Sequence, residues 1–265
     1  MSTFRDALAG ADAPLVGLWN ASGSAVAAEI MAGSGADLLL VDGEHGPISI
    51  SEMLPILQAA AGYPVTTIVR VPWNDPVLIK QVLDLGAQNV LVPMVSSADD
   101  ARAAVRAARY PGAAGEREGV RGIGSALARS SRWGRIPGYV QDADQHVSVT
   151  VQIETADAAA NAAAIAAVDG VDAVFIGPAD LAGSMGYPGQ ASEPAVVDAV
   201  DAVIDAVVAA GKPVGVNTFA PADADRCIAR GASFVFVAAD VTLMARGSEA
   251  AVARLKRTRT ETDSY

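Results

Sequence analysis

Residues 148–181, SVTVQIETADAAANAAAIAAVDGVDAVFIGPADL, decide the fold. An apolar run over 148–153 is followed by an alanine-rich window over 156–167 and by a second apolar run over 173–176. Alanine favours helices, and short runs that are apolar on both faces are typical of parallel strands covered by helices. The segment therefore predicts a strand–helix–strand unit with a parallel pairing.

The same unit repeats along the chain of 265 residues, a length close to the ~250 of a typical (β/α)8 barrel. Eight strands alternating with helices favour a closed parallel sheet. We expect an α/β fold, a (β/α)8 TIM barrel, as a single domain over 1–265. The expected strands are 15–19, 37–41, 66–71, 89–95, 148–153, 173–176, 213–216 and 234–237, and the helices lie near 24–33, 51–61, 76–85, 98–109, 156–167, 194–210, 222–230 and 240–256.

Four glycines mark the helix ends of this pattern. Gly35, Gly86, Gly170 and Gly231 each stand shortly before an expected strand. Glycine commonly ends a helix in the left-handed conformation and turns the chain into the next element. We expect all four to do so.

Composition excludes several classes of function. The formal net charge of −11 argues against nucleic acid as a partner, because phosphate binding needs clustered Lys and Arg. No apolar stretch of about 18 residues is present, so no membrane span is expected. The single cysteine, Cys227, allows no internal disulfide, and the amino-terminal segment lacks the apolar core of a signal peptide. The cytoplasm is the expected compartment.

One irregular stretch, residues 110–147, separates the fourth and fifth expected strands and holds five arginines. It reads either as a surface excursion or as a functional loop, since loops of this length in compact domains are often functional. We expect it to leave the fourth strand at the carboxyl end, where barrel active sites form. The arginines are Arg117, Arg121, Arg129, Arg132 and Arg135.

Polar groups end four of the expected strands. Because the working groups of a barrel lie at the carboxyl ends of its strands, these four endings predict a single active-site mouth. They are Asp42-Gly43-Glu44-His45-Gly46, Arg70, Gln152-Ile153-Glu154 and Gly177-Pro178-Ala179-Asp180.

Glu154 and Asp180 predict a metal site. They stand about one strand–helix unit apart, which places them at adjacent strand ends. Two carboxylates without a ligand histidine suit a hard cation such as Mg²⁺ or Mn²⁺. Either acid alone could instead be a helix N-cap or a surface charge.

His45 is the candidate general base, because imidazole titrates near neutral pH and this residue directly follows a strand end. Asp42 and Asp84 are the two candidates for the carboxylate that would orient it. A lone histidine is otherwise usually structural, which is the interpretation we give to His146, just before the fifth strand.

Arg70 suits a carboxylate or enolate oxygen, which a guanidinium binds through paired hydrogen bonds. The alternative is a buried ion pair with a neighbouring acid. None of the lysines, Lys80, Lys212 and Lys256, ends a strand, so a Schiff-base mechanism is rejected. The ends of the last two strands lack a glycine-rich phosphate site, which makes a phosphorylated substrate unexpected.

Taken together, these motifs resemble the 4-hydroxy-2-oxoheptanedioate aldolases of the HpcH/HpaI aldolase/citrate lyase family. The resemblance covers nearly the whole chain in order. It rests on Gly17-Leu18-Trp19, Asp42-Gly43-Glu44-His45-Gly46, Arg70-Val71-Pro72, Val92-Pro93-Met94-Val95, Ser131-Arg132-Trp133-Gly134-Arg135-Ile136-Pro137, Gln152-Ile153-Glu154-Thr155 and Gly177-Pro178-Ala179-Asp180-Leu181.

The resemblance implies a class II aldolase that cleaves 4-hydroxy-2-oxo acids to pyruvate and an aldehyde, with Mg²⁺, Mn²⁺ or Co²⁺ as cofactor. It implies that Glu154 and Asp180 bind the metal, and that His45, paired with Asp84 and supported by Asp42, serves acid–base catalysis. It also implies a homohexamer with an exchanged C-terminal helix, in which a neighbouring subunit contributes to each mouth. The substrate-binding residues would be Trp19, Arg70, Gln152, Gly177, Pro178 and Ala179.

One departure concerns the end of the seventh strand. Asn217-Thr218 stands where an enzyme for 4-hydroxy-2-oxoheptanedioate is expected to be more apolar, so a 2-keto-3-deoxy acid becomes a candidate substrate.

Two other interpretations of the function stay open. A lyase for CoA thioesters would use the arginines of 110–147, and a barrel could also bind an oxo acid without catalysis, since fold alone does not establish activity.

Overall fold

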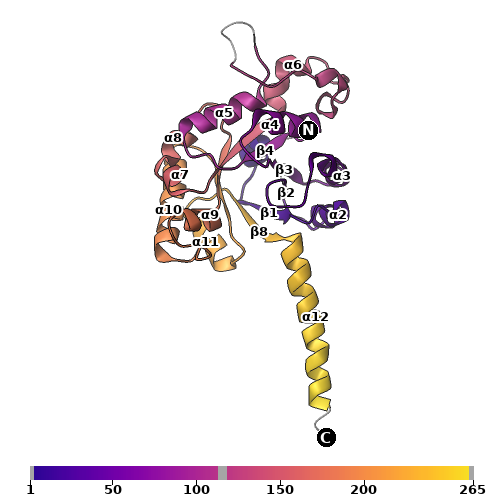
Figure 1. Cartoon of the computed structure of the whole chain (residues 1–265), viewed down its shortest axis with the longest axis vertical. Helices are drawn as coiled ribbons and strands as arrows, with labels where there is room; N and C mark the ends of the chain where they lie inside the picture. The colour runs from indigo at the N-terminus through magenta and orange to yellow at the C-terminus, as the bar shows by residue number, and fades with distance from the viewer. Residues whose placement is uncertain (1–2, 113–117, 263–265) are drawn as a thin grey trace.

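The computed structural model describes residues 3–112 and 118–262 and shows a closed barrel of eight parallel strands in sequence order. Every predicted strand is present, with ends that differ from the prediction by at most three residues. Figure 1 shows the helices arranged around the strands. The strands are β1 (Leu15–Asn20), β2 (Leu38–Asp42), β3 (Thr66–Arg70), β4 (Asn89–Val92), β5 (Ser148–Ile153), β6 (Ala173–Ile176), β7 (Val214–Asn217) and β8 (Phe234–Ala239).

The predicted helices are also present, and the window over 156–167 is divided at Asn161 into two short helices. Three further helices, α1, α6 and α9, were not predicted. The α-helices are α1 (Phe4–Ala9), α2 (Ala25–Ala32), α3 (Ile50–Ala60), α4 (Pro76–Asp84), α5 (Ala98–Ala108), α6 (Tyr139–Asp142), α7 (Ala156–Ala160), α8 (Ala162–Ala166), α9 (Pro178–Ser184), α10 (Pro194–Ala209), α11 (Pro221–Ala229) and α12 (Asp240–Thr262).

The barrel interior is filled by large side chains, as in other barrels of eight strands. Phe175, Phe234 and Phe236 are buried there and contact one another edge-on or stacked. Phe4 of α1 packs edge-on against Phe234 at 5.0 Å between ring centroids, and its backbone N–H donates to Asn89 at 2.6 Å. Helix α1 therefore closes the amino end of the barrel and leaves the carboxyl end as the open mouth.

The predicted glycine caps are confirmed at Gly86 and Gly231, which directly follow the C-cap residues of α4 and α11. Gly35 and Gly170 lie instead in the turns after the C-cap residues of α2 and α8. Gly35, Gly86, Gly170 and Gly231 have φ values of 93°, 89°, 88° and 113°. A side chain at such positions would be strained, since L-residues rarely adopt positive φ.

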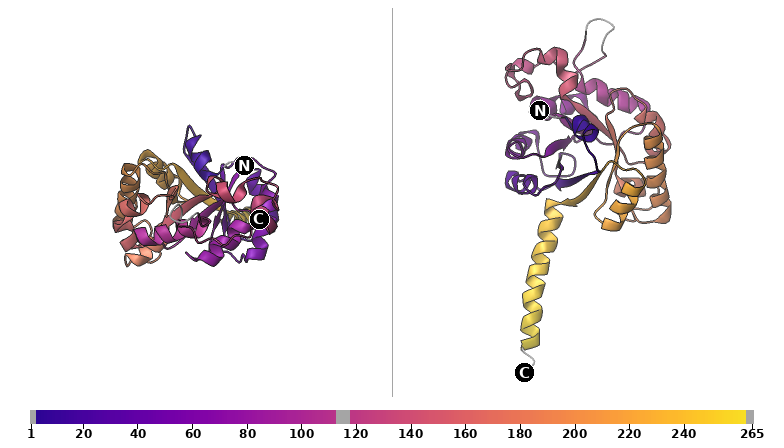
Figure 2. Two further views of the ribbon diagram at one scale, coloured as in Figure 1. Left: turned by 90° about the horizontal axis from the view of Figure 1, so that it is seen from above. Right: turned by 180° about the vertical axis from the view of Figure 1, so that it is seen from behind.

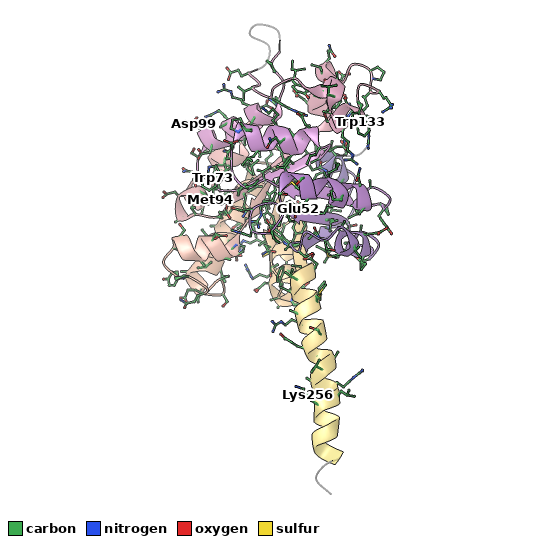
Figure 3. The ribbon with its side chains drawn as sticks, turned by 45° about the vertical axis from the view of Figure 1, so that its right-hand side comes forward. Glu52, Trp73, Met94, Asp99, Trp133 and Lys256 are labelled. Carbon is green, nitrogen blue, oxygen red and sulfur yellow. The ribbon has the colours of Figure 1, made fainter. Side chains whose placement is uncertain are left out.

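The position predicted for residues 110–147 was wrong. Helix α5 follows β4 and returns the chain to the amino end of the barrel, so the stretch begins there and not at the mouth. Arg129 donates to the carbonyl of Leu85 at the end of α4, and His146 stacks on Tyr139 at 5.6 Å. Figures 1 and 3 show α6 and Trp133 on the side of the barrel away from α12.

Helix α12 extends away from the barrel, as Figures 1 and 2 show, and Figure 3 places Lys256 far along it. Val241, Met244, Val252 and Leu255 are exposed on this helix. Their spacing puts them on one face, because residues three, seven, eight or eleven apart align on a helix. The helix thus presents an apolar stripe that its own barrel does not cover. In the described part of the chain, no helix is long and apolar enough to cross a membrane.

Candidate active site

The four polar strand ends meet at one mouth, as predicted. They enclose a cavity of about 220 Å³. The size suits a small organic acid rather than a polymer. The lining includes Trp19, Asp42, His45, Arg70, Gln152, Phe175, Gly177, Pro178, Ala179, Asp180, Asn217 and Phe219.

Arg70, the last residue of β3, is held by two acids and an aromatic ring. Its Nε and Nη2 donate to the two oxygens of Asp42 at 2.9 and 2.8 Å, and its Nη1 lies 2.9 Å from Glu44. The guanidinium lies 4.6 Å from the centroid of the Trp19 ring. Paired hydrogen bonds and ring stacking fix the orientation of the guanidinium, and only 5% of the residue is exposed.

Glu154, just after β5, is a buried carboxyl group. Its Oε1 accepts from the backbone N–H of Met94 at 2.7 Å, and its Oε2 accepts from the Gln152 amide. Burial, together with the nearby charges of Glu44 and Asp180, raises the pKa of Glu154 to about 7. The hydrogen bonds oppose this rise but do not cancel it. The carboxylate form therefore lacks a compensating positive charge.

The donor set fits a divalent cation. Asp180, in the first turn of α9, acts electrostatically on both Glu154 and Glu44. The Gln152 Oε1 atom is buried without a hydrogen-bond partner among the described residues. A cation beside Glu154 would supply the missing positive charge, and two carboxylates would leave further positions for water or a chelating substrate. Among the described residues, no group of three or more His, Cys, Asp or Glu is arranged to hold a metal ion, so this site would depend on two carboxylates and other oxygen ligands.

Gly177 makes the close packing of this corner possible. A Cβ atom built on it would lie 3.0 Å from Gln152 Nε2 and 3.1 Å from Glu154 Oε2. Any side chain there would push the carboxyl group away from its position. Gly177, directly after β6, therefore leaves room for the carboxyl group of Glu154, directly after β5.

His45 lies on the turn after β2. The Asp42 carboxylate accepts from the backbone N–H groups of Glu44 and His45 and so fixes this turn. The imidazole is 64% exposed, and its Nε2 lies 3.9 Å from Glu44 Oε2. Asp42 orients the backbone of His45 rather than its imidazole, because its oxygens are engaged by Arg70.

Asp84 does not reach His45 within one chain. Helix α4 runs antiparallel to β3, so its last residue lies at the amino end of the barrel, opposite the mouth. There Asp84 accepts from Arg121 at 2.7 Å, and Arg121 lies over the Tyr110 ring at 4.4 Å. Of the predicted site residues, Asp84 lies at the opposite end of the barrel, and Glu154 does not line the cavity itself but contacts Gln152, which does.

Two features of the mouth were not predicted as functional. Glu44 was noticed only as a neighbour of His45, yet it pairs with Arg70, and burial raises its pKa. Met94 donates its N–H to Glu154 from a backbone with φ of 55°, a value that is unusual for a residue with a side chain. The Val92-Pro93-Met94-Val95 motif was the available signal for Met94, but sequence does not reveal a positive φ.

Fold and site together define a barrel enzyme with an acidic centre and a buried arginine. The family model described as HpcH/HpaI aldolase/citrate lyase matches residues 15–247. The chain belongs to this family and is a carbon–carbon lyase of the aldolase type. The fold predicted from the sequence and the resemblance to the family are both confirmed.

Curated relatives and solved structures agree with this membership. A 4-hydroxy-2-oxo-heptane-1,7-dioate aldolase of Salmonella arizonae is 51% identical over 253 residues, 96% of this chain and 94% of the relative. A family protein of Burkholderia cenocepacia J2315 aligns with a TM-score of 0.90 at 37% identity, over 95% of this chain and 98% of that one. An HpcH/HpaI aldolase of Desulfitobacterium hafniense DCB-2 aligns with a TM-score of 0.85 at 29% identity, over 96% and 97%.

The CoA-thioester alternative loses its structural basis in this chain. It required the arginines of 110–147 beside the mouth, but Arg121 and Arg129 lie at the other end of the barrel. Arg117 lies outside the described residues. The non-catalytic alternative is disfavoured by the relatives, which are named as aldolases at 51% identity.

Proposed function

We propose that this protein is a divalent-metal-dependent class II aldolase, which cleaves 4-hydroxy-2-oxo acids reversibly to pyruvate and an aldehyde. One observation carries the proposal. A single cavity of about 220 Å³ is lined by Asp180, Gln152 and the buried Arg70, and the buried Glu154 carboxyl group accepts a hydrogen bond from Gln152 at the wall of that cavity. This arrangement suits a 2-oxo acid, whose two adjacent oxygens can bind a cation while a guanidinium neutralises developing charge.

Glu154 and Asp180 would hold the metal. Mg²⁺ or Mn²⁺ fits a site of oxygen ligands best, and Co²⁺ is a further candidate. When bound, the cation supplies Lewis acidity to the oxygens of the 2-oxo acid. The Gln152 amide, whose oxygen has no hydrogen-bond partner in the described part of the chain, would complete the polar wall beside it.

Arg70 would stabilise the negative charge that develops on the keto oxygen during cleavage. Asp42 and Glu44 hold its guanidinium in place before substrate arrives, so that little reorganisation is needed. Trp19, Gly177, Pro178 and Ala179 would form the walls that position the pyruvyl group.

His45 would act as the base. In the cleavage direction it takes the proton of the C4 hydroxyl, directly or through water, and the C3–C4 bond breaks to release the aldehyde. Protonation of C3 then gives pyruvate. The exposed imidazole needs an orienting acid, and Asp84 could supply it only from a neighbouring subunit.

A homohexamer with exchanged α12 helices agrees with the apolar stripe on that helix. The barrel also has uncovered apolar surface, at Val16 of β1 and at Val26 and Ile30 of α2. In a regular (β/α)8 barrel the last helix would cover the strands next to it. We propose that α12 of a neighbour covers this surface and brings the subunits together.

Exchange of the pyruvate methyl protons with deuterium tests the proposed site without any aldehyde. We expect wild-type protein loaded with Mn²⁺ to exchange them, and EDTA or Glu154→Gln to slow the exchange strongly. Exchange at the full rate in EDTA would contradict the assignment of Glu154 and Asp180 as metal ligands.

A further inference from the structure

A second hollow adjoins the mouth beside the proposed pyruvate site. It has a volume of about 380 Å³ and lies between α9, the start of α10 and the turn after β7. The two cavities share four lining residues, Pro178, Ala179, Asn217 and Phe219. A substrate that extends from the metal corner past Asn217 would enter this second hollow.

Trp19 fixes the Asn217 side chain at the junction. The indole Nε1–H of Trp19 donates to Asn217 Oδ1 at 2.9 Å. An indole nitrogen can only donate, so its partner must be the amide oxygen and not the amide nitrogen. The orientation of the amide is thereby set, and the NH2 group is the end left for a molecule in the two cavities.

The charge of the combined space disfavours a carboxylate on the distal part of the substrate. Among the described lining residues, the arginines are Arg70 and Arg226, and each is already paired with two acids. Arg226 contacts Asp201 closely and lies 3.9 Å from Asp223, which itself lines the second hollow. An incoming carboxylate would meet the Asp223 charge without an available cation.

We infer that Asn217 selects the aldehyde, and that the preferred aldehyde is an uncharged chain bearing hydroxyl groups. This inference rests on the proposed aldolase function. The two N–H donors of Asn217 match hydroxyl oxygens, and the second hollow adds the hydroxyl groups of Ser192 and Thr218 to its lining. The relatives named for the heptanedioate would release an aldehyde that ends in a carboxylate, so this chain would differ from them in specificity.

Rates of pyruvate addition to three aldehydes test the inference. The probes are glyceraldehyde, which is neutral and hydroxylated, succinic semialdehyde, which ends in a carboxylate, and propanal, which has neither group. We expect wild-type kcat/KM to be highest for glyceraldehyde. Asn217→Leu should lower the ratio of kcat/KM for glyceraldehyde to kcat/KM for propanal about tenfold or more, because a hydrogen bond to the hydroxylated substrate is lost.

Asn217→Asp serves as the second variant, since it keeps the acceptor for Trp19 Nε1–H but removes both donors. It should lose the preference for glyceraldehyde as well. Deuterium exchange into pyruvate is measured in parallel in wild type and both variants, so that any effect transmitted through Trp19 to the pyruvate site is separated from the effect on aldehyde preference. With exchange intact, a wild-type preference for succinic semialdehyde, or unchanged glyceraldehyde kinetics in both variants, would overturn the inference. Loss of exchange in wild-type protein would instead contradict the proposed function.

Discussion

Arg70 is the residue on which the chemistry of the mouth depends most directly. Its guanidinium is pre-oriented by Asp42 and Glu44 and stacked on Trp19. We expect Arg70→Ala to lower turnover by more than ~100-fold, the scale observed when one electrostatic stabiliser of a transition state is removed. Steady-state pyruvate release measures this loss.

Arg70→Lys is the matched control for that substitution, because it keeps the charge that balances the two acids but loses the paired geometry. We expect it to fold as wild type and to remain well below wild-type turnover. Near-wild-type turnover in Arg70→Ala would remove Arg70 from the mechanism.

Glu154 gives the metal-free protein a defined dependence on pH. Burial raises its pKa to about 7, so the folded state binds this proton more tightly than the unfolded chain does. Its contribution to stability is therefore present at low pH and is lost as pH rises toward 7 and above. In EDTA, we expect the melting temperature to fall between pH 5 and pH 8.

Glu154→Gln isolates this contribution, since the amide does not titrate. The melting temperature of Glu154→Gln should vary less between pH 5 and pH 8. In wild-type protein, saturating Mn²⁺ should reduce the fall in melting temperature over this range, because a bound cation stabilises the carboxylate. Identical pH dependence in wild type and Glu154→Gln would argue against a raised pKa at this position.

Most of the site residues could be predicted, because each of them ends a strand. His45, Arg70, Glu154 and Asp180 reach the mouth by the general geometry of parallel barrels, which sequence periodicity is enough to indicate. The partners within the site could not be predicted. Whether Asp42 contacts His45 or Arg70 depends on side-chain geometry at the turn after β2, and the sequence is compatible with both.

At the level of strands and helices, the proposed metal site at Glu154 and Asp180 depends on the close approach of the end of β5 to the turn between β6 and α9. A Cβ at Gly177 would crowd Glu154 and Gln152. We expect Gly177→Ala to weaken Mn²⁺ binding about tenfold or more, since displaced ligands and their supports typically cost that much affinity. Calorimetric titration with Mn²⁺ measures the effect.

Gly183→Ala is the control on the same helix, because nothing lies within 4 Å of the Cβ it would add. It should bind Mn²⁺ as wild type does. Equal affinities in the two variants would show that packing at Gly177 does not set the position of the carboxyl group.

The connection 110–147 shows where element-level prediction failed. The stretch was assigned to the mouth because it follows β4, but α5 intervenes and reverses the direction of the chain. In an alternating barrel, a connection after a helix lies at the amino end and a connection after a strand lies at the carboxyl end. Counting from α5 would have placed Arg129 correctly.

At the level of the whole molecule, α12 leaves the barrel with an uncovered apolar stripe. If neighbouring barrels bury this stripe, charges placed on it should break the assembly. We expect Met244→Glu combined with Leu255→Glu to reduce the oligomer to smaller species, because buried unpaired carboxylates are strongly unfavourable. Sedimentation velocity gives the distribution of species.

Arg246→Gln is the control for this variant, since Arg246 lies on another face of α12 and its contact with Glu249 is an exposed i,i+3 ion pair. It should assemble as wild type does. An unchanged assembly in the double variant would contradict the exchange of α12.

The most direct test of the account is pyruvate release from 4-hydroxy-2-oxo acids, coupled to lactate dehydrogenase. The protein is assayed as prepared, after treatment with EDTA, and after Mg²⁺, Mn²⁺ or Co²⁺ is added back. A metal-dependent aldolase should form pyruvate in a reaction that EDTA abolishes and a divalent cation restores. Folded protein that forms no pyruvate with any of these metals would contradict the proposed function.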